Sequence, residues 1–212
     1  VKTDDPAELK YQEAERLAGT DHDKAAAAYR EAISLRSGFT RAYIGLARVL
    51  SEDSDMDGAL AAIKALRNTS PRNAEASAVE GRIYKDNGDD DKAIAAFKRS
   101  IVEGKGFQPE AYTGLGLLYK ERAEGLGGAV DKEAAAYTES AKNLRIALRQ
   151  LSGAPDATVL YQLLGLVLER QKKYAEAIRL YQEFLRYFPD SSDAPAIQSF
   201  IDQLKKQLAE QN

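Results

Sequence analysis

The sequence repeats with a period of 34 residues, and this period constrains the fold more than any other feature. Ala25, Ala59 and Ala93 stand 34 residues apart, and the same spacing separates Tyr29, Ile63 and Phe97. A period between roughly 20 and 50 residues is typical of solenoids, in which each repeat buries its apolar face only by stacking on its neighbours. We therefore predict a stack of similar units with a continuous core.

A second pattern marks the first helix that we predict in each unit. It occurs in the segments 43–50, 77–84, 112–119 and 161–168. Each segment has a small residue at the same place, and these residues are Ala47, Gly81, Gly116 and Gly165. Two helices approach closely only where a small residue lies at their crossing. We expect these four residues to lie opposite the alanines of the second helices, which are Ala25, Ala59, Ala93 and Ala177.

The composition predicts an all-α fold. Hydrophobic residues make up 44% of the 212 residues, which is enough for a sizeable core. Alanine, leucine, glutamate and lysine dominate, and runs of β-branched and aromatic residues bounded by turn residues are missing. Apolar periodicity and capping residues predict helices at 6–18, 22–36, 40–52, 56–68, 74–87, 90–103, 109–124, 131–151, 157–171, 174–187 and 194–209.

The last unit carries the most complete motif, with Tyr174, Ala177, Tyr181, Phe184 and Pro189 at fixed offsets, and Pro71 closes the second unit at the matching place. The sequence resembles the tetratricopeptide repeat (TPR) family over nearly its whole length. The resemblance implies a right-handed superhelical α-solenoid of about five helix-turn-helix repeats in a single domain, 1–212, with a C-terminal capping helix at 194–209. The repeats would span 6–39, 40–73, 74–107, 109–154 and 158–191.

The fourth repeat contains an insertion. Gly116 and Gly165 are 49 residues apart, which exceeds the period by fifteen residues. We interpret the segment 120–140 as the lengthened end of a hairpin, in which the glycines between 125 and 128 form the turn and Asp131 caps the next helix. If each helix gained about six residues, its tip would extend by roughly 9 Å.

The charges and reactive residues exclude several functions. The chain has 30 basic and 33 acidic residues, so no strong field favours nucleic acid. With no cysteine and one histidine, the sequence offers no thiol chemistry and no His-rich metal cluster, and we predict neither a cofactor nor an enzyme. No apolar run is long enough for a membrane span or signal peptide. The chain begins at Val1 and its only methionine is Met56, so we expect that the native amino terminus was removed or omitted.

Two groups of polar residues have a structural and a functional interpretation. His22 stands between Asp21 and Asp23, and we interpret it as a solvated loop histidine, with a metal or acid–base site as the alternative. The alternating acids Asp53, Asp55 and Asp57, with Gly58 directly after them, resemble the first half of an EF-hand loop, but no acidic residue follows at the end of the loop. We interpret them, and the acids at 89–91, as N-caps and turn residues, with calcium binding as the alternative.

The resemblance also places a binding groove on the concave face, which the first helices of successive repeats line. The predicted lining comprises Arg41, Ile44, Arg48, Glu52, Glu75, Ala78, Arg82, Lys85, Thr113, Leu117, Lys120, Gln162, Leu166 and Arg170. Its mild basic excess suits an extended or helical partner segment with apolar anchors and some acidic character. A solvated mixed surface is the alternative. The lysine and asparagine set of the TPR clamp for a C-terminal carboxylate is not reproduced, because Ile44, Arg48, Val79 and Arg82 occupy the matching places.

The predicted function is a non-catalytic scaffold that binds other proteins or peptide segments. The alternatives are a self-associating, homo-oligomeric platform and a regulatory TPR module of a larger protein. The fifth unit, 174–191, also resembles repeats of bacterial cell-envelope TPR proteins. Together with the absence of cysteine, this resemblance predicts a periplasmic or envelope-associated protein that acts in the assembly of an envelope complex, with a cytoplasmic location as the alternative.

Overall fold

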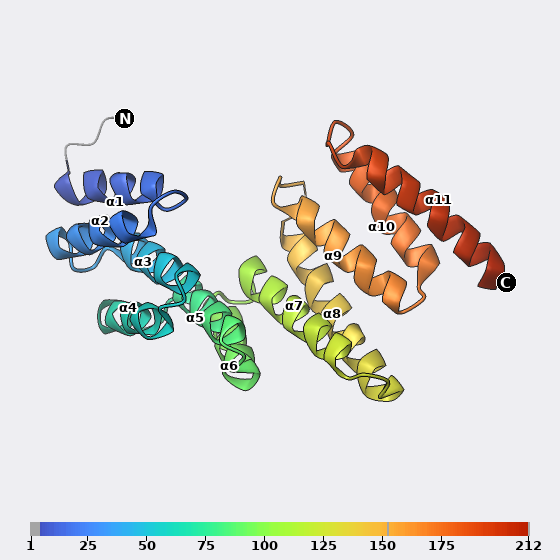
Figure 1. The fold of residues 1–212 in the computed structure, drawn as a ribbon, viewed down its shortest axis with the longest axis horizontal. Coiled ribbons are helices and arrows are strands. Elements are labelled where there is room, and N and C mark those ends of the chain that lie inside the picture. Colours follow the sequence, from blue (N-terminus) through green and yellow to red (C-terminus); the bar gives the residue numbers. More distant parts are fainter. Residues whose placement is uncertain (1–4, 152, 212) are drawn as a thin grey trace. The chain divides into compact units, whose positions relative to one another are not determined.

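The computed structural model describes residues 5–151 and 153–211. In this part of the chain eleven α-helices account for the regular structure, and no strand occurs (Figure 1). The all-α prediction is confirmed, and each end of every predicted helix lies within two residues of its observed position. The chain divides into two compact units, one ending at Ala111 and the other beginning at Tyr112. Each unit is described by itself, and the single domain 1–212 stays a prediction.

The first unit consists of three helical hairpins. They pair α1 (Pro6–Leu17) with α2 (His22–Leu35), α3 (Thr40–Glu52) with α4 (Met56–Thr69), and α5 (Ala74–Asp86) with α6 (Asp90–Glu103). Helices α2 and α3 pack together, as do α3 and α5, so the hairpins stack as the repeat predicts. Several helices begin at an Asx cap. The side chains of Asp5, Asp21, Asp55 and Asn73 accept a backbone N–H from the first turn of the helix that follows.

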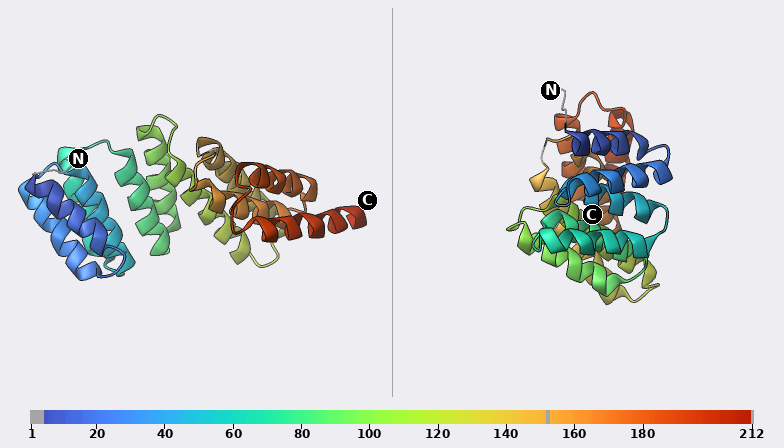
Figure 2. Two further views of the ribbon diagram at one scale, coloured as in Figure 1. Left: turned by 90° about the horizontal axis from the view of Figure 1, so that it is seen from above. Right: turned by 90° about the vertical axis from the view of Figure 1, so that its left-hand side faces the viewer.

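The second unit contains most of α7 (Pro109–Gly125), together with α8 (Val130–Gln150), α9 (Ala157–Arg170), α10 (Tyr174–Tyr187) and α11 (Ala194–Gln211). Helices α9 and α10 form a hairpin, and α11 packs along α10 as the predicted C-terminal helix (Figure 2). The apolar face of α11 is buried through Ile197, Ile201 and Leu204, and the rest of the helix is mostly polar and exposed.

In three hairpins a glycine of the first helix lies against a large side chain of the second helix, a contact that sequence analysis did not predict. In α5 and α6, a Cβ atom added at Gly81 would lie 2.6 Å from the Phe97 ring. A Cβ atom added at Gly165 would overlap the Tyr181 side chain, and one added at Gly116 would lie 2.6 Å from Leu144. The large side chain is thus the nearest neighbour of the Cβ position at each glycine, and the expected contact with the alanines stays a prediction. The alanines of the second helices are buried, but the ring or leucine fills the space that the glycine leaves.

Sequence analysis missed Gly45, which joins two successive hairpins. It lies in α3, and a Cβ atom there would stand 2.4 Å from the Tyr29 ring of α2. We had assigned the small position of this repeat to Ala47, which is fully buried. The repeat thus uses both residues, because the alanine serves the buried core of the hairpin while the glycine admits the neighbouring tyrosine.

The insertion is divided unequally between its two helices. Helix α7 has 17 residues against 14 in α9, so it gains about 4.5 Å and not 9 Å. Helix α8 has 21 residues against 14 in α10. The predicted cap at Asp131 is also wrong, because α8 begins at Val130 and Asp131 lies in its first turn. The expected glycine turn is present, since Gly127 and Gly128 have φ angles of 51° and 100°, which glycine adopts without strain.

We expect Gly81→Ala to destabilise the protein by about 1–3 kcal/mol, because the added methyl group overpacks a contact with a fully buried ring. Gly125→Ala is the matched control. Gly125 is also helical, but an added Cβ atom there meets nothing within 4 Å. The control should leave stability unchanged or raise it by up to about 1 kcal/mol, since alanine is the better helix former. Urea unfolding followed by circular dichroism compares the two variants, and equal stabilities would contradict the proposed packing.

Candidate functional site

The first unit has a cavity of about 500 Å³ on the face formed by its first helices. Residues of α1, α3 and α5 line it, together with Tyr29 of α2. Three predicted groove residues, Arg41, Ile44 and Arg48, come together there. All three belong to α3, and their spacing of three and four residues places them on one side of the helix.

Arg48 and Arg82 share one carboxylate. Nη2 of Arg48 lies 3.1 Å from Oε2 of Glu110 and 3.4 Å from Oε1 of Glu75. Nη1 of Arg82 lies 3.8 Å from the other oxygen of Glu110. Glu110 is the second residue of α7 and still belongs to the first unit, so it ties the start of that helix to α3 and α5. The buried Nε of Arg48 has no hydrogen-bond partner among the described residues.

Arg41 is held by a carboxylate and by two aromatic rings. Its Nη2 lies 2.8 Å from Oε2 of Glu8, and its guanidinium carbon lies 4.7 Å from the centre of the Tyr11 ring and 5.4 Å from that of Phe39. A planar guanidinium suits both contacts at once. This contact fixes the position of the arginine at the mouth of the cavity between α1 and α3.

The predicted basic excess of the groove is therefore not observed in the first unit. Arg41, Arg48 and Arg82 each pair with a carboxylate of the protein itself, and Glu8 and Glu110 had not been assigned to the groove. A sequence signal for such pairs exists. Arg41 follows Glu8 by 33 residues and Glu110 follows Arg82 by 28 residues, so each pair joins neighbouring first helices. Opposite charges about one repeat apart could have indicated them.

Three predicted residues of this unit offer little surface to a partner, and one of them, Ala78, is fully buried. Ile44 is only 3% exposed and belongs to the core, although its edge lines the cavity. Lys85 lies 3.2 Å from Asp86, its neighbour in sequence. Beneath the cavity, the Tyr29 hydroxyl donates to Oε1 of Glu15 at 2.5 Å. Burial of Tyr29, together with this hydrogen bond to Glu15, raises the pKa of the phenol, which therefore stays neutral.

The second unit places the other predicted residues on α7 and α9. On α7, Thr113 and Leu117 are half-buried, and Lys120 Nζ pairs with Glu124 at 2.8 Å. On α9, Gln162 donates to Asp193 at 2.9 Å, while Arg170 is exposed.

One face of α9 also carries exposed apolar residues. Leu166 is 37% exposed, and Val159, which sequence analysis missed, is 58% exposed. Val159 and Leu166 are seven residues apart and so lie on the same side of the helix. Val159, Gln162 and Leu166 therefore form an apolar and polar strip on the first-helix face of this unit.

The structure corrects the interpretation of His22. It is the first residue of α2 and not a loop residue, and its Nδ1 lies 2.5 Å from Oδ1 of Asp53, while Nε2 lies 3.6 Å from Glu52. These contacts join the start of α2 to the end of α3. The hydrogen bond to Asp53 and the nearby carboxylates raise the pKa of the imidazole above its ordinary value of 6.5.

The acidic turns serve the helices that follow them. Oδ1 of Asp55 accepts the backbone N–H of Gly58 at 2.9 Å, which confirms the N-cap of α4, and Asp57 lies in the first turn. Asp89 precedes α6 without capping it through its side chain, and instead pairs with Lys92 at 3.0 Å. Among residues 5–151 and 153–211, no three His, Cys, Asp or Glu side chains are placed to hold a metal ion together.

The comparisons with known proteins agree with this architecture. Models of the tetratricopeptide repeat match residues 15–68, 57–109 and 159–191, which together span more than half of the chain. The chain belongs to the tetratricopeptide repeat family. A search of curated protein sequences finds no significant match.

Several solved structures are similar in fold. Yeast Tom70 has a TM-score of 0.75 at 16% identity over 97% of this chain, and the chain spans 41% of that protein's length. Pseudomonas aeruginosa PilF has a TM-score of 0.67 at 13% identity, covering 98% of this chain and 92% of its own. PilW, a type IV pilus biogenesis factor, has a TM-score of 0.66 at 13% identity, with coverage of 97% and 93%. At these identities the likeness shows the fold alone.

No helix in the described part of the chain is both long and apolar enough to cross a lipid bilayer. The family and the structure together support a scaffold for protein–protein interaction, since TPR repeats present extended surfaces to other proteins.

We expect His22 to stabilise the protein more at low pH than at high pH. Because its folded-state pKa is raised, the contribution is complete below the unfolded pKa of about 6.5 and is lost as the pH rises through the folded value. His22→Gln should therefore lower the urea midpoint at pH 5.5 and change it little at pH 8.5. His22 is the only histidine, so its NMR titration reports the pKa directly. A pKa at or below 6.5, or an equal effect of the variant at both values of pH, would contradict the pairing with Asp53.

Proposed function

We propose that this protein is a non-catalytic scaffold that holds a segment of a partner protein against its first-helix face. The observation that carries the proposal is the cavity of about 500 Å³ between α1, α3 and α5, into which the TPR repeat brings Arg41 and Arg48. A repeat scaffold of this family offers its first helices to extended or helical segments. The exposed Val159 and Leu166 on the corresponding face of α9 supply apolar contact area in the second unit.

The ion pairs restrict the chemistry of the partner segment. Because Arg41, Arg48 and Arg82 are already paired, a purely electrostatic ligand would gain little net energy from them. A partner carboxylate would have to replace Glu75 or Glu110 beside Arg48. We therefore propose a segment of mixed charge with an apolar anchor. The anchor would lie against the Tyr11 ring, which lines the same cavity and is only partly buried.

We further propose that this scaffold acts in the assembly of a complex in the bacterial cell envelope and is located in the periplasm. The similarity in fold to PilF and PilW supports this process, since PilW is a type IV pilus biogenesis factor. The motif of residues 174–191 and the absence of cysteine support the compartment.

The groove assignment predicts a selective loss of partners from the variant Arg41→Ala/Arg48→Ala. Partners captured by the immobilised protein from a lysate of the source organism would be quantified by mass spectrometry, and the affinity of each would then be measured with purified components. We expect a groove partner to lose roughly tenfold in affinity, as the removal of two charge-assisted contacts implies.

The matched control is Arg72→Ala/Lys98→Ala. It removes the same charge from two exposed residues of the first unit that do not line the cavity. Control and wild type should capture the same partners with the same affinity. If every specific partner binds the groove variant as tightly as the wild type, the groove assignment is wrong. If the captured protein is the chain itself, the self-associating platform replaces the proposal.

A further inference from the structure

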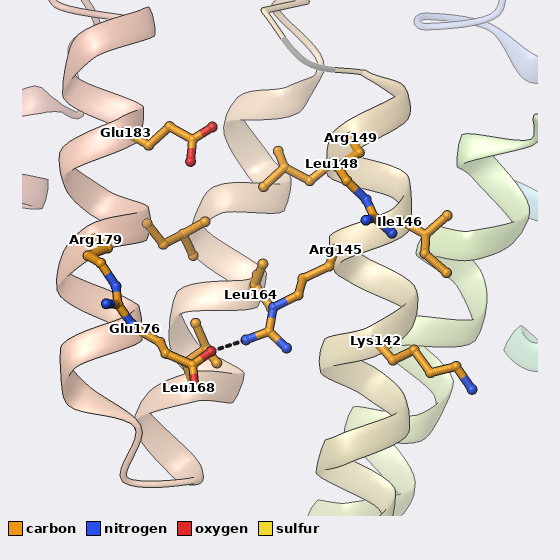
Figure 3. A pocket seen from close by; sticks show the side chains of 11 residues that line it. Lys142, Arg145, Ile146, Leu148, Arg149, Leu164, Leu168, Glu176, Arg179 and Glu183 are labelled. Carbon is orange, nitrogen blue, oxygen red and sulfur yellow. Dashed lines mark hydrogen bonds and ion pairs between the residues drawn. The ribbon is translucent and has the colours of Figure 1, made fainter.

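The second unit contains a cavity that is larger than the cavity of the first unit. It is formed mainly by second helices, whereas first helices form the predicted groove. Its volume is about 680 Å³, and it lies between α8 and α10, the second helices of their hairpins, with α9 at its base (Figure 3). None of the predicted groove residues lines it. A volume of this size falls within the range of roughly 300–1,000 Å³ that is usual for ligand pockets.

The base of this cavity is apolar. Leu164 and Leu168 of α9 lie there, and Leu180 of α10 and Ile146 of α8 extend the apolar surface to both sides. The two leucines of α9 are each 1% exposed and the side chain of Ile146 is half-buried. Helices α8 and α10 each pack on α9, so α9 separates them and leaves a groove above its leucines. A large apolar side chain entering from outside would bury surface mainly against Ile146 and Leu180, which are more exposed than the two leucines.

The rim of the cavity has an excess of positive charge. Lys142, Arg145, Arg149 and Arg179 line it, against the two carboxylates of Glu176 and Glu183. The rim thus carries two more positive than negative charges, on a chain whose formal net charge is -3. This excess is local, and it favours an anionic ligand at this place on the surface.

Two of the four cations have no partner in the described part of the chain. Figure 3 shows Arg145 reaching from α8 toward Glu176 of α10, with which it forms an ion pair. Lys142 pairs with Glu139 at 3.2 Å, and Glu183 accepts a hydrogen bond from the Tyr161 hydroxyl at 3.2 Å. Arg149 and Arg179 make no ion pair or hydrogen bond with residues 5–151 or 153–211, and both are exposed.

We infer that this cavity is a second protein-binding site, which takes a short acidic segment of a partner protein with a large apolar residue at its centre. The apolar residue lies over Leu164 and Leu168, and flanking carboxylates pair with Arg149 on α8 and Arg179 on α10. Guanidinium groups on both sides of an apolar base favour a carboxylate on each side of the anchor, because each can bind a carboxylate through two parallel hydrogen bonds. The site is independent of the first-helix groove.

To test this inference, a display library of random twelve-residue peptides is selected for binding to the immobilised full chain. The affinities of the enriched sequences are then measured by calorimetry with synthetic peptides. We expect enrichment of peptides with a leucine or aromatic residue flanked by aspartate or glutamate. Their affinity for Arg149→Glu/Arg179→Glu should fall at least about tenfold, since two attractive pairs become repulsive. Ile146→Ser should also weaken the same peptides, and circular dichroism confirms that each variant is folded.

The matched control is Arg186→Glu/Lys206→Glu, which changes the net charge equally through exposed residues of α10 and α11 outside the cavity. It should retain affinity within about twofold. The inference is overturned if no enriched peptide is sensitive to Arg149 and Arg179, if the control weakens binding as much, or if glutamine and asparagine replace the acids without loss. It is also overturned if the cavity variant abolishes self-association in sedimentation, because a second copy of this chain would then be the occupant.

Discussion

A glycine on the first helix of a hairpin allows a large side chain of the second helix to lie directly against its backbone, and the close packing of the hairpins within each unit depends on this contact. Gly81 receives Phe97, Gly165 receives Tyr181, and Gly116 receives Leu144. Gly45 extends the same principle between hairpins by admitting Tyr29. With the helices held this close, their apolar residues form a continuous core in each unit, and the other side of each first helix is left free to present polar groups.

The repeat that builds the core also aligns charges on neighbouring first helices. Glu8 with Arg41, Arg48 with Glu75, and Arg82 with Glu110 each join helices one repeat apart. Such pairs hold the first-helix face in place while leaving it nearly neutral, so selectivity there depends on shape and apolar contact more than on charge. The cavity between α8 and α10 differs, because its apolar base is bordered by two arginines that have no ion-pair partner among the described residues. The protein thus offers two surfaces of different chemistry.

The positions of the helices could be predicted almost completely from the sequence, because the 34-residue period and the apolar spacing indicate each helix, and Asx caps mark the start of four of them. The partner of each glycine could not, since the period gives positions along the chain but not the rotation of one helix against another. For the same reason the sequence did not indicate that Phe97 and Tyr181 are the side chains nearest to Gly81 and Gly165. The division of the insertion between α7 and α8 likewise depends on where the turn at Gly127 and Gly128 forms.

The candidate site was predicted only in part. The structure brings Arg41 and Arg48 to one cavity, while their role in binding stays a prediction. The helical repeat could not show that Ile44 is 3% exposed or that Glu110 reaches back from the start of α7. The sequence did not predict that Val159 is exposed, because a valine in a helical repeat is usually interpreted as a core residue. The cavity of the second unit combines residues of three helices, from Lys142 to Glu183, and no local motif joins them.

The central claim is that the glycine and the large side chain opposite it form one packing unit, and a double-mutant cycle on Gly81 and Phe97 tests it most directly. Urea unfolding would give the free energies for Gly81→Ala, Phe97→Leu and the double variant. The account predicts that the leucine makes room for the added methyl group, so the double variant is more stable than the sum of the single effects by about 1 kcal/mol or more. Additive effects, within about 0.3 kcal/mol, would contradict the account.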